Sequence, residues 1–245
     1  MIKTTTIDYA HGGIGLEAYV AWDESSAGAR PAVLIAHMWA GRVEFCCQWA
    51  RDMARAGYVG FALDLYGKGV IGSSIEENRR LMQPLIDDRG LLQERMNLAF
   101  ETAAGLPQVD RTRIAAIGFC FGGLCVLDLA RCNRELAAAV SFHGLLGAPD
   151  NLEPDRITAR ILVLHGDADP LVAAEEPDAL RRELTQCEAD WQFIHFGHAV
   201  HAFTNPQAND PDFGTVYDER TDRRARRYAA EFLDEVFAEV RDEAP

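Results

Sequence analysis

The chain has 245 residues, of which 48% are hydrophobic and 25% are charged. These values are typical of a folded globular protein and exclude collagen, coiled coils and wholesale disorder. The 24 Lys and Arg residues and 38 Asp and Glu residues give a formal net charge of −14, which disfavours contact with a nucleic-acid backbone. We therefore expect no nucleic-acid partner.

Membrane and export signals are not visible in the chain. No apolar run approaches the about 20 residues of a membrane-spanning helix, and residues 1–6 lack the apolar core of a secretory signal. The six cysteines form no C-x-x-C pair and are too sparse for a disulfide scaffold. We expect reduced thiols, a cytoplasmic location and a monomer or small homo-oligomer.

Short apolar runs mark the expected strands. The chain begins with two alternating segments, residues 4–9 and 16–22, which predict a hairpin at a sheet edge. Non-alternating apolar runs, typical of strands covered on both faces, follow at residues 31–36, 58–65, 113–120, 138–143, 160–165 and 190–196.

Helical segments separate these strands. They are expected at residues 45–56, 91–104, 122–132 and 173–186. A further helix is expected to begin at a capping box at residues 73–77 and to run past Arg80, with Pro84 and Gly90 dividing it from the helix at residues 91–104. A last helix carries Tyr228, Phe232, Val236 and Val240 on one apolar face. The alternation predicts one α/β domain over residues 1–245, with a mostly parallel sheet between two helical layers. Ligands in such sheets bind at the carboxyl ends of the strands.

Residues 118–123, Gly-Phe-Cys-Phe-Gly-Gly, end a predicted strand and open a helix. They fit G-x-S-x-G with Cys120 in place of serine, and the flanking glycines let neighbouring backbone pass without a Cβ clash. The helix N-terminus favours the thiolate, and the N–H of Phe121 points to where an oxyanion would form. The simpler interpretation is a strand-to-helix turn that contains a buried cysteine.

A thiol nucleophile needs a base, and the base needs an orienting acid. Asp167 and Asp169 follow the strand that ends near residue 165, and His198 and His201 follow the next strand, so the order nucleophile, acid, histidine is satisfied. His195 lies inside that strand and is interpreted as structural. The three histidines lack the further ligands of a zinc signature, so we expect no metal.

Together these segments resemble the dienelactone hydrolase family of α/β-hydrolases over essentially the whole chain. The matching pieces are residues 33–41, 57–67, 118–123, 141–144, 165–170 and 201–206. The resemblance implies that Cys120 is the nucleophile, Asp169 the acid and His201 the base. It also implies that the N–H groups of Phe121 and Trp39 form the oxyanion hole. The implied reaction is hydrolysis of a small ester or lactone through an acyl-thioenzyme.

Two positions depart from the pattern of family members that act on dienelactone. Met38 stands where those enzymes carry a glutamate that helps to activate the thiol, and Asn205 stands where they carry an arginine that holds the substrate carboxylate. His201 must then activate Cys120 directly, or a thiolate–imidazolium pair exists at rest. Three arginines could replace the missing one, although surface helix charge is the simpler interpretation: Arg79, Arg80 and Arg89.

Three residues are expected to line an apolar substrate pocket, namely Met38, His143 and Phe203. Aromatic residues near the site can equally belong to the core. Residues 67–72 match G-x-G-x-x-G but lack the compact βαβ context and downstream acid of a dinucleotide site, so we expect no cofactor. Two other functions stay open: a redox-responsive thiol protein in which Cys120 is oxidised, and a catalytically silent scaffold.

Overall fold

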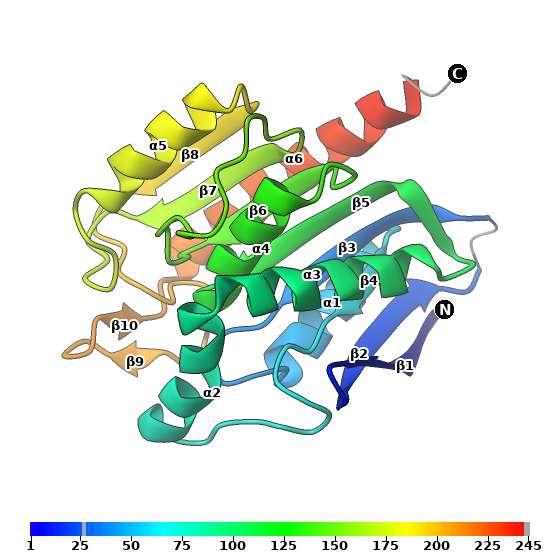
Figure 1. Cartoon of the computed structure of the whole chain (residues 1–245), viewed down its shortest axis with the longest axis horizontal. Helices are drawn as coiled ribbons and strands as arrows, with labels where there is room; N and C mark the ends of the chain where they lie inside the picture. The colour runs from blue at the N-terminus through cyan, green and yellow to red at the C-terminus, as the bar shows by residue number, and fades with distance from the viewer. Residues whose placement is uncertain (26–27, 243–245) are drawn as a thin grey trace.

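The computed structural model describes residues 1–25 and 28–242, with side chains described up to residue 239. An eight-stranded sheet with the order β1-β2-β4-β3-β5-β6-β7-β8 runs through the molecule (Figure 1). Its strands are β1 (Ile2–His11), β2 (Ile14–Asp23), β3 (Arg30–Ala36), β4 (Val59–Ala62), β5 (Val109–Phe119), β6 (Ala138–Phe142), β7 (Arg160–Gly166) and β8 (Trp191–Phe196). A separate two-stranded hairpin is formed by β9 (Asn209–Asp210) and β10 (Thr215–Val216).

Six helices connect the strands in the described part of the chain. They are α1 (Glu44–Arg55), α2 (Ile75–Asp87), α3 (Arg89–Ala104), α4 (Phe121–Cys132), α5 (Glu176–Gln186) and α6 (Glu219–Asp242). None of them is long and apolar enough to cross a membrane. The strand and helix order confirms the predicted alternation.

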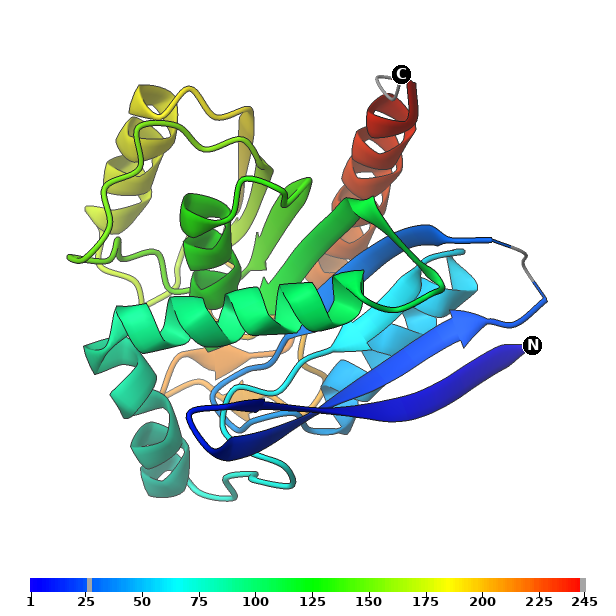
Figure 2. The same cartoon turned by 45° about the vertical axis from the view of Figure 1, so that its right-hand side comes forward.

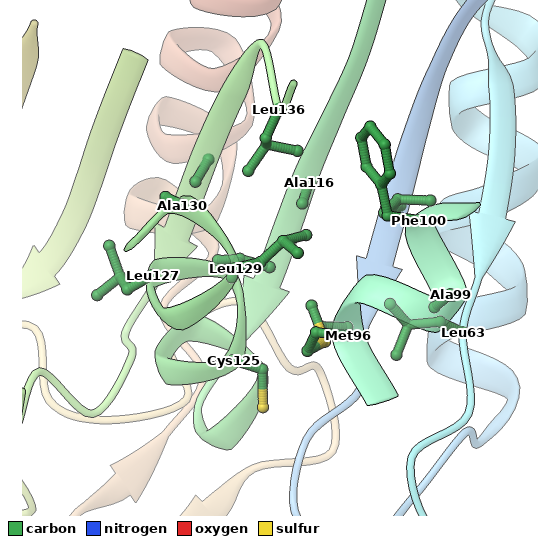
Figure 3. Close-up of a cluster of buried hydrophobic side chains, with 14 of the residues drawn as sticks. Leu63, Met96, Ala99, Phe100, Ala116, Cys125, Leu127, Leu129, Ala130 and Leu136 are labelled. Carbon is green, nitrogen blue, oxygen red and sulfur yellow. The ribbon is translucent and has the colours of Figure 1, made fainter. Parts of the chain in front are cut away.

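Two apolar layers enclose the sheet. Helices α2 to α5 pack on one face, and α1 and α6 pack on the other. Figure 3 shows part of the first layer, where Phe100 of α3 and Leu129 of α4 belong to the same cluster as Ala116 of β5. In the second layer Phe232 and Val236 of α6 are buried as predicted, while the Val240 side chain lies outside the described residues.

The sheet is mostly parallel, as predicted. Strands β1 and β2 pair antiparallel at one edge, β2 pairs antiparallel with β4, and the remaining neighbours are parallel (Figure 2). Strand β4 is shorter than the predicted residues 58–65. The reason is a turn closed by Asp64, whose Oδ1 accepts hydrogen bonds from the N–H groups of Tyr66 and Gly67.

The predicted capping box opens α2, but the break between α2 and α3 differs from the expectation. The Ser74 hydroxyl accepts a hydrogen bond from the Glu77 N–H at 3.2 Å, and the Glu77 carboxylate accepts one from the Ser73 N–H at 2.9 Å. Pro84 lies inside α2 instead of dividing the segment. The division falls at Asp88, which caps α3 through the Leu91 N–H.

Candidate active site

Cys120 sits at the sharp turn between β5 and α4. Its backbone has φ +56° and ψ −119°, a conformation that non-glycine residues adopt only under strong constraint. The constraint comes from close backbone approach on both sides. A Cβ at Gly118 would lie 2.0 Å from the Gly122 carbonyl oxygen, and a Cβ at Gly122 would lie 2.3 Å from the Ala36 carbonyl oxygen. The predicted glycine spacing is therefore required by the packing of β3, β5 and α4.

Downstream of the turn, His201 is paired with Asp169. Nδ1 of His201 lies 2.7 Å from Oδ2 of Asp169, and the two side chains are 2% and 0% exposed. Asp167 does not pair with either histidine that the sequence left open; it contacts His195 at the surface, at 3.0 Å. His198 is exposed. The geometry therefore selects Asp169 and His201 from the four residues that the sequence left open.

The backbone of His201 is held by the β9–β10 hairpin. Its N–H donates to the Gly214 carbonyl at 3.0 Å, and its carbonyl accepts from the Val216 N–H at 3.1 Å. On the carboxylate side, Oδ1 of Asp169 accepts from the Leu171 N–H at 2.9 Å. Both members of the pair are thus fixed by their loops as well as by each other.

The electrostatics of the site favour a protonated His201. Burial lowers its pKa, but negative charge on the Cys120 sulfur, together with Asp169, outweighs burial and raises the pKa to about 10. Nε2 of His201 is buried and has no hydrogen-bond partner among the described residues. His201 and Cys120 line the same cavity. A proton on Nε2 is therefore available for transfer within this cavity.

Two backbone N–H groups face no described acceptor at this edge of the sheet. Phe121 is the first residue of α4, so its N–H has no partner within the helix. Trp39 lies in the loop after β3, and its N–H donates to no described backbone or side-chain acceptor. These are the two groups expected to form an oxyanion hole.

Cys120 and His201 open into one cavity of about 320 Å³. Its walls come from the β3 loop, α2, the β6–β7 connection and the segment after His201, and its lining residues are Met38, Trp39, Arg79, Met82, Cys120, Leu145, Leu171, His201, Ala202, Asn205, Ala208, Phe213 and Thr215. The lining is mainly apolar, and Arg79 is the residue in it with a permanent charge. A cavity of this size suits a small substrate.

The three expected pocket residues have different positions. Met38 lines the cavity, but His143 and Phe203 do not, since both are completely buried. The ring of His143 lies 5.2 Å from His201 and 4.9 Å from Phe203, and its Nε2 lies 2.8 Å from the Thr204 hydroxyl. These two residues therefore form a packed layer behind His201 instead of a substrate wall.

Sequence reasoning missed several residues of the cavity wall. Phe213, at the tip of the β9–β10 hairpin, stacks on Trp39 with ring centroids 5.8 Å apart. Met82 projects from α2, where its i, i+3 spacing places it on the same helix face as Arg79, one of the three arginines that the sequence offered. Of the other arginines considered, Arg89 is engaged by the buried Asp128 at 2.6 Å.

The Gly-rich segment 67–72 lies in the loop between β4 and α2. Among the described residues, no three or more His, Cys, Asp or Glu side chains group together as metal ligands would.

Comparison with known proteins identifies the family of this chain. The model of the dienelactone hydrolase family matches residues 16–237. The chain belongs to the dienelactone hydrolase family. Solved structures that cover 96–97% of this chain share its fold, which confirms the α/β-hydrolase architecture, and the family is one of hydrolases.

Two solved structures and one curated relative illustrate the match. P91, a dienelactone hydrolase-like promiscuous phosphotriesterase from metagenomic libraries, is 32% identical, with a TM-score of 0.91 and coverage of 96% of this chain and 99% of that one. A structure named m3DLH is 36% identical at the same TM-score of 0.91 and the same coverage. A Yersinia pestis protein, provisionally named a carboxymethylenebutenolidase, is 29% identical over 202 residues, which cover 78% of this chain and 75% of that protein.

Proposed function

We propose that the protein hydrolyses small carboxylic esters or lactones through an acyl-thioenzyme on Cys120. The observation that carries the proposal is the shared cavity, into which Cys120 and an Asp169-bound His201 both open. Membership of a hydrolase family supports the reaction type. The assignment of roles to these three residues belongs to the proposal.

Acylation begins with the thiolate. The Cys120 sulfur attacks the carbonyl carbon, a C–S bond forms, and the carbonyl electron pair moves onto oxygen. The N–H groups of Trp39 and Phe121 stabilise this oxyanion, and one such donor contributes on the order of 10²–10³ in rate. When the intermediate collapses, the C–O bond to the leaving group breaks, and the departing oxygen takes the proton from Nε2 of His201.

Deacylation follows from a change of charge at the sulfur. A thioester sulfur carries no negative charge, so the part of the rise in the His201 pKa that comes from Cys120 is removed, while Asp169 remains. Neutral His201 then takes a proton from water, and the oxygen of that water attacks the thioester carbonyl. The C–S bond breaks, the thiolate re-forms beside a protonated imidazole, and Asp169 keeps Nδ1 protonated throughout.

The cavity wall narrows the class of substrate. Met38 occupies the place of the glutamate in family members that act on dienelactone, so no carboxylate from this position takes part in activating the thiol. A thiolate is a weakly basic leaving group, which favours esters, thioesters and enol lactones over amides. Arg79 is the wall residue able to face an anionic group of the substrate.

The test is trapping of the acyl-enzyme. After brief exposure to p-nitrophenyl acetate, intact-mass measurement should show one added acetyl group on wild type and none on Cys120→Ala. Cys132→Ala, which removes another partly exposed cysteine of α4, serves as the matched control and should acylate normally. Acetylation or turnover that persists in Cys120→Ala would contradict the proposal.

The alternatives predict other outcomes of the same experiment. A redox-responsive thiol protein would show reversible oxidation of Cys120 without acylation. A silent scaffold would show neither acylation nor iodoacetamide labelling faster than that of an ordinary free thiol.

A phosphotriester is a second candidate substrate, because P91 is described as a promiscuous phosphotriesterase and matches at 32% identity. Attack at phosphorus would use the same thiolate and release the same kind of phenolic leaving group. A panel that pairs p-nitrophenyl acetate with diethyl p-nitrophenyl phosphate separates the two. Release of nitrophenol from the ester alone would confine the activity to carboxylic substrates.

A further inference from the structure

His37 follows β3 directly and is completely buried, and it is not among the residues that line the cavity. We infer that His37 is a positioning residue that orients the Trp39 N–H of the oxyanion hole by holding the peptide bond between Met38 and Trp39. The inference rests on the proposed function, in which that N–H stabilises the oxyanion.

Both ring nitrogens of His37 have partners, and the partners determine where the proton lies. Nε2 lies 3.2 Å from the Leu65 nitrogen, and because a backbone N–H can only donate, Nε2 must be the acceptor. The proton of the neutral ring is therefore on Nδ1, which donates to the Met38 carbonyl oxygen at 2.7 Å. Burial, the largest influence, lowers the pKa of His37 and so favours this neutral form.

The bond to Met38 controls the next residue because of peptide geometry. The Met38 carbonyl and the Trp39 N–H belong to one planar peptide unit, and the described chain contains no cis peptide bond. In a trans unit the C=O and the N–H point in opposite directions, so fixing the oxygen fixes the direction of the hydrogen. Nδ1 of His37 thus fixes the Met38 carbonyl oxygen, and through the planar peptide unit it fixes the direction of the Trp39 N–H.

Other contacts make the same loop rigid. The Gly41 N–H also donates to the Met38 oxygen, at 3.1 Å, and the Tyr66 hydroxyl donates to the Trp39 oxygen at 3.0 Å. Among the described bonds to the peptide unit between Met38 and Trp39, only the one from His37 comes from a side chain. The Trp39 N–H itself is left without a described acceptor, as a donor reserved for a ligand requires.

The second oxyanion donor packs against the same histidine. The ring of Phe121 lies 6.3 Å from that of His37, and Tyr66 lies 4.6 Å away on an edge-to-face contact. The backbone of His37 also contacts the turn at residues 118–122, which we call the elbow, since a Cβ at Gly122 would lie 2.7 Å from the His37 carbonyl oxygen. His37 therefore links the β3 loop to the start of α4, which carry one donor each.

Two isosteric variants separate the two ring nitrogens. In His37→Asn the amide nitrogen takes the place of Nδ1 and can still donate to the Met38 oxygen, whereas in His37→Gln the amide oxygen takes the place of Nε2 and can only replace the acceptor. We expect His37→Gln to lower kcat for p-nitrophenyl acetate by about 10- to 100-fold with KM within about 2-fold. This is less than the loss on removal of a whole oxyanion donor, on the order of 10²–10³, because the Trp39 N–H is misoriented and not removed. His37→Asn should recover most of kcat.

A reaction without an oxyanion serves as the control. Alkylation of Cys120 by iodoacetamide forms no carbonyl oxyanion, so its rate should stay within about 2-fold of wild type in both variants. Equal losses of acylation and alkylation, or an unchanged kcat in folded His37→Gln, would overturn the inference. Wild type that alkylates normally but never acylates would instead overturn the proposed function, and the inference with it.

The ring itself provides a measurement that does not depend on activity or on how the variants fold. The ¹⁵N chemical shifts of His37 in the wild-type protein should report the neutral tautomer with its proton on Nδ1. A proton on Nε2 would overturn the inference even if all the variants behaved as expected.

Discussion

Nδ1 of His201 lies 2.7 Å from Oδ2 of Asp169, although the two residues are 32 positions apart in the chain. The pair forms because β7 and β8 are parallel neighbours, so the loops that follow them meet at the same edge of the sheet. The carboxylate holds the proton on Nδ1 and thereby leaves Nε2 for the cavity. This fixed tautomer is the basis of the first prediction.

Replacing Asp169 with Asn should lower kcat/KM for p-nitrophenyl acetate by on the order of 10³–10⁴-fold, since the amide favours the wrong tautomer of His201. The chain offers a matched control in Asp167→Asn, which breaks the exposed contact with His195 and should leave kcat/KM within about 2-fold of wild type. Similar losses in both variants would show that the buried pair has no special role.

The pKa of His201 should fall when the sulfur is removed. In wild type the Cys120 charge helps to raise this pKa to about 10, so the ring should stay protonated over about pH 6–9. Because the folded pKa lies above the ordinary value of 6.5, the resulting stabilisation is complete below pH 6.5 and is lost as the pH rises through about 10. An NMR titration should find a lower pKa for His201 in Cys120→Ala, and an unchanged value would contradict the proposed ion pair.

Gly122→Ala should destabilise the fold, because the new methyl group would meet the Ala36 carbonyl oxygen at 2.3 Å and the backbone of β3 or α4 would have to shift. We expect the free energy of unfolding in urea to fall by about 1–3 kcal/mol, the usual range for overpacking. Gly15→Ala is the control, since nothing lies within 4 Å of the position that its new methyl group would take. Equal stability of the two variants would contradict the close approach at the elbow.

Asp128 is a residue of α4 and is fully buried between Arg89 of α3 and Arg131 of α4. It accepts hydrogen bonds from Arg89 at 2.6 Å and from Arg131 at 2.9 Å. Asp128→Ala leaves both guanidinium groups without this partner, so thermal or urea unfolding should show a loss of about 3–5 kcal/mol. The exposed pair of Asp178 and Arg181 provides a contrast, and Asp178→Ala should cost less than about 1 kcal/mol.

Phe213→Ala should change substrate selection more than chemistry. It removes the stack on Trp39, an interaction of the kind that contributes about 0.5–1.5 kcal/mol. KM for bulky aromatic esters should rise about 2- to 10-fold, while the acetyl ester and iodoacetamide should react at nearly wild-type rates. A uniform loss with all reagents would indicate that the hairpin had unfolded instead.

The sequence predicted the elbow well because Gly118, Cys120 and Gly122 lie within five consecutive positions, so their spacing can be read directly from the sequence. The close backbone contacts at the two glycines explain why that spacing is needed. Choosing the acid and the base was different, since Asp167 and His198 satisfy the same chain order and only a family resemblance favoured Asp169 and His201. The contacts that separate them depend on how two loops fold together. No periodic pattern reveals that arrangement.

The wall of the cavity was harder still to predict. His143 and Phe203 adjoin site segments in the sequence, but their side chains pack against each other in the layer behind His201, and both proved to be core. Phe213 lies on a hairpin whose strands contain two residues each, too short to carry an alternating pattern. Its role became visible only through the stack on Trp39.

The β9–β10 hairpin holds the backbone of His201 through Gly214 and Val216, and the same hairpin places Phe213 in the wall of the cavity. The shape of the cavity and the position of His201 therefore depend on the same hairpin. A mutation that enlarges the cavity at this hairpin would also change the position of the His201 imidazole, so adaptation to larger substrates there would lower turnover. Met82 on α2 offers a route to enlargement that is separate from the hairpin.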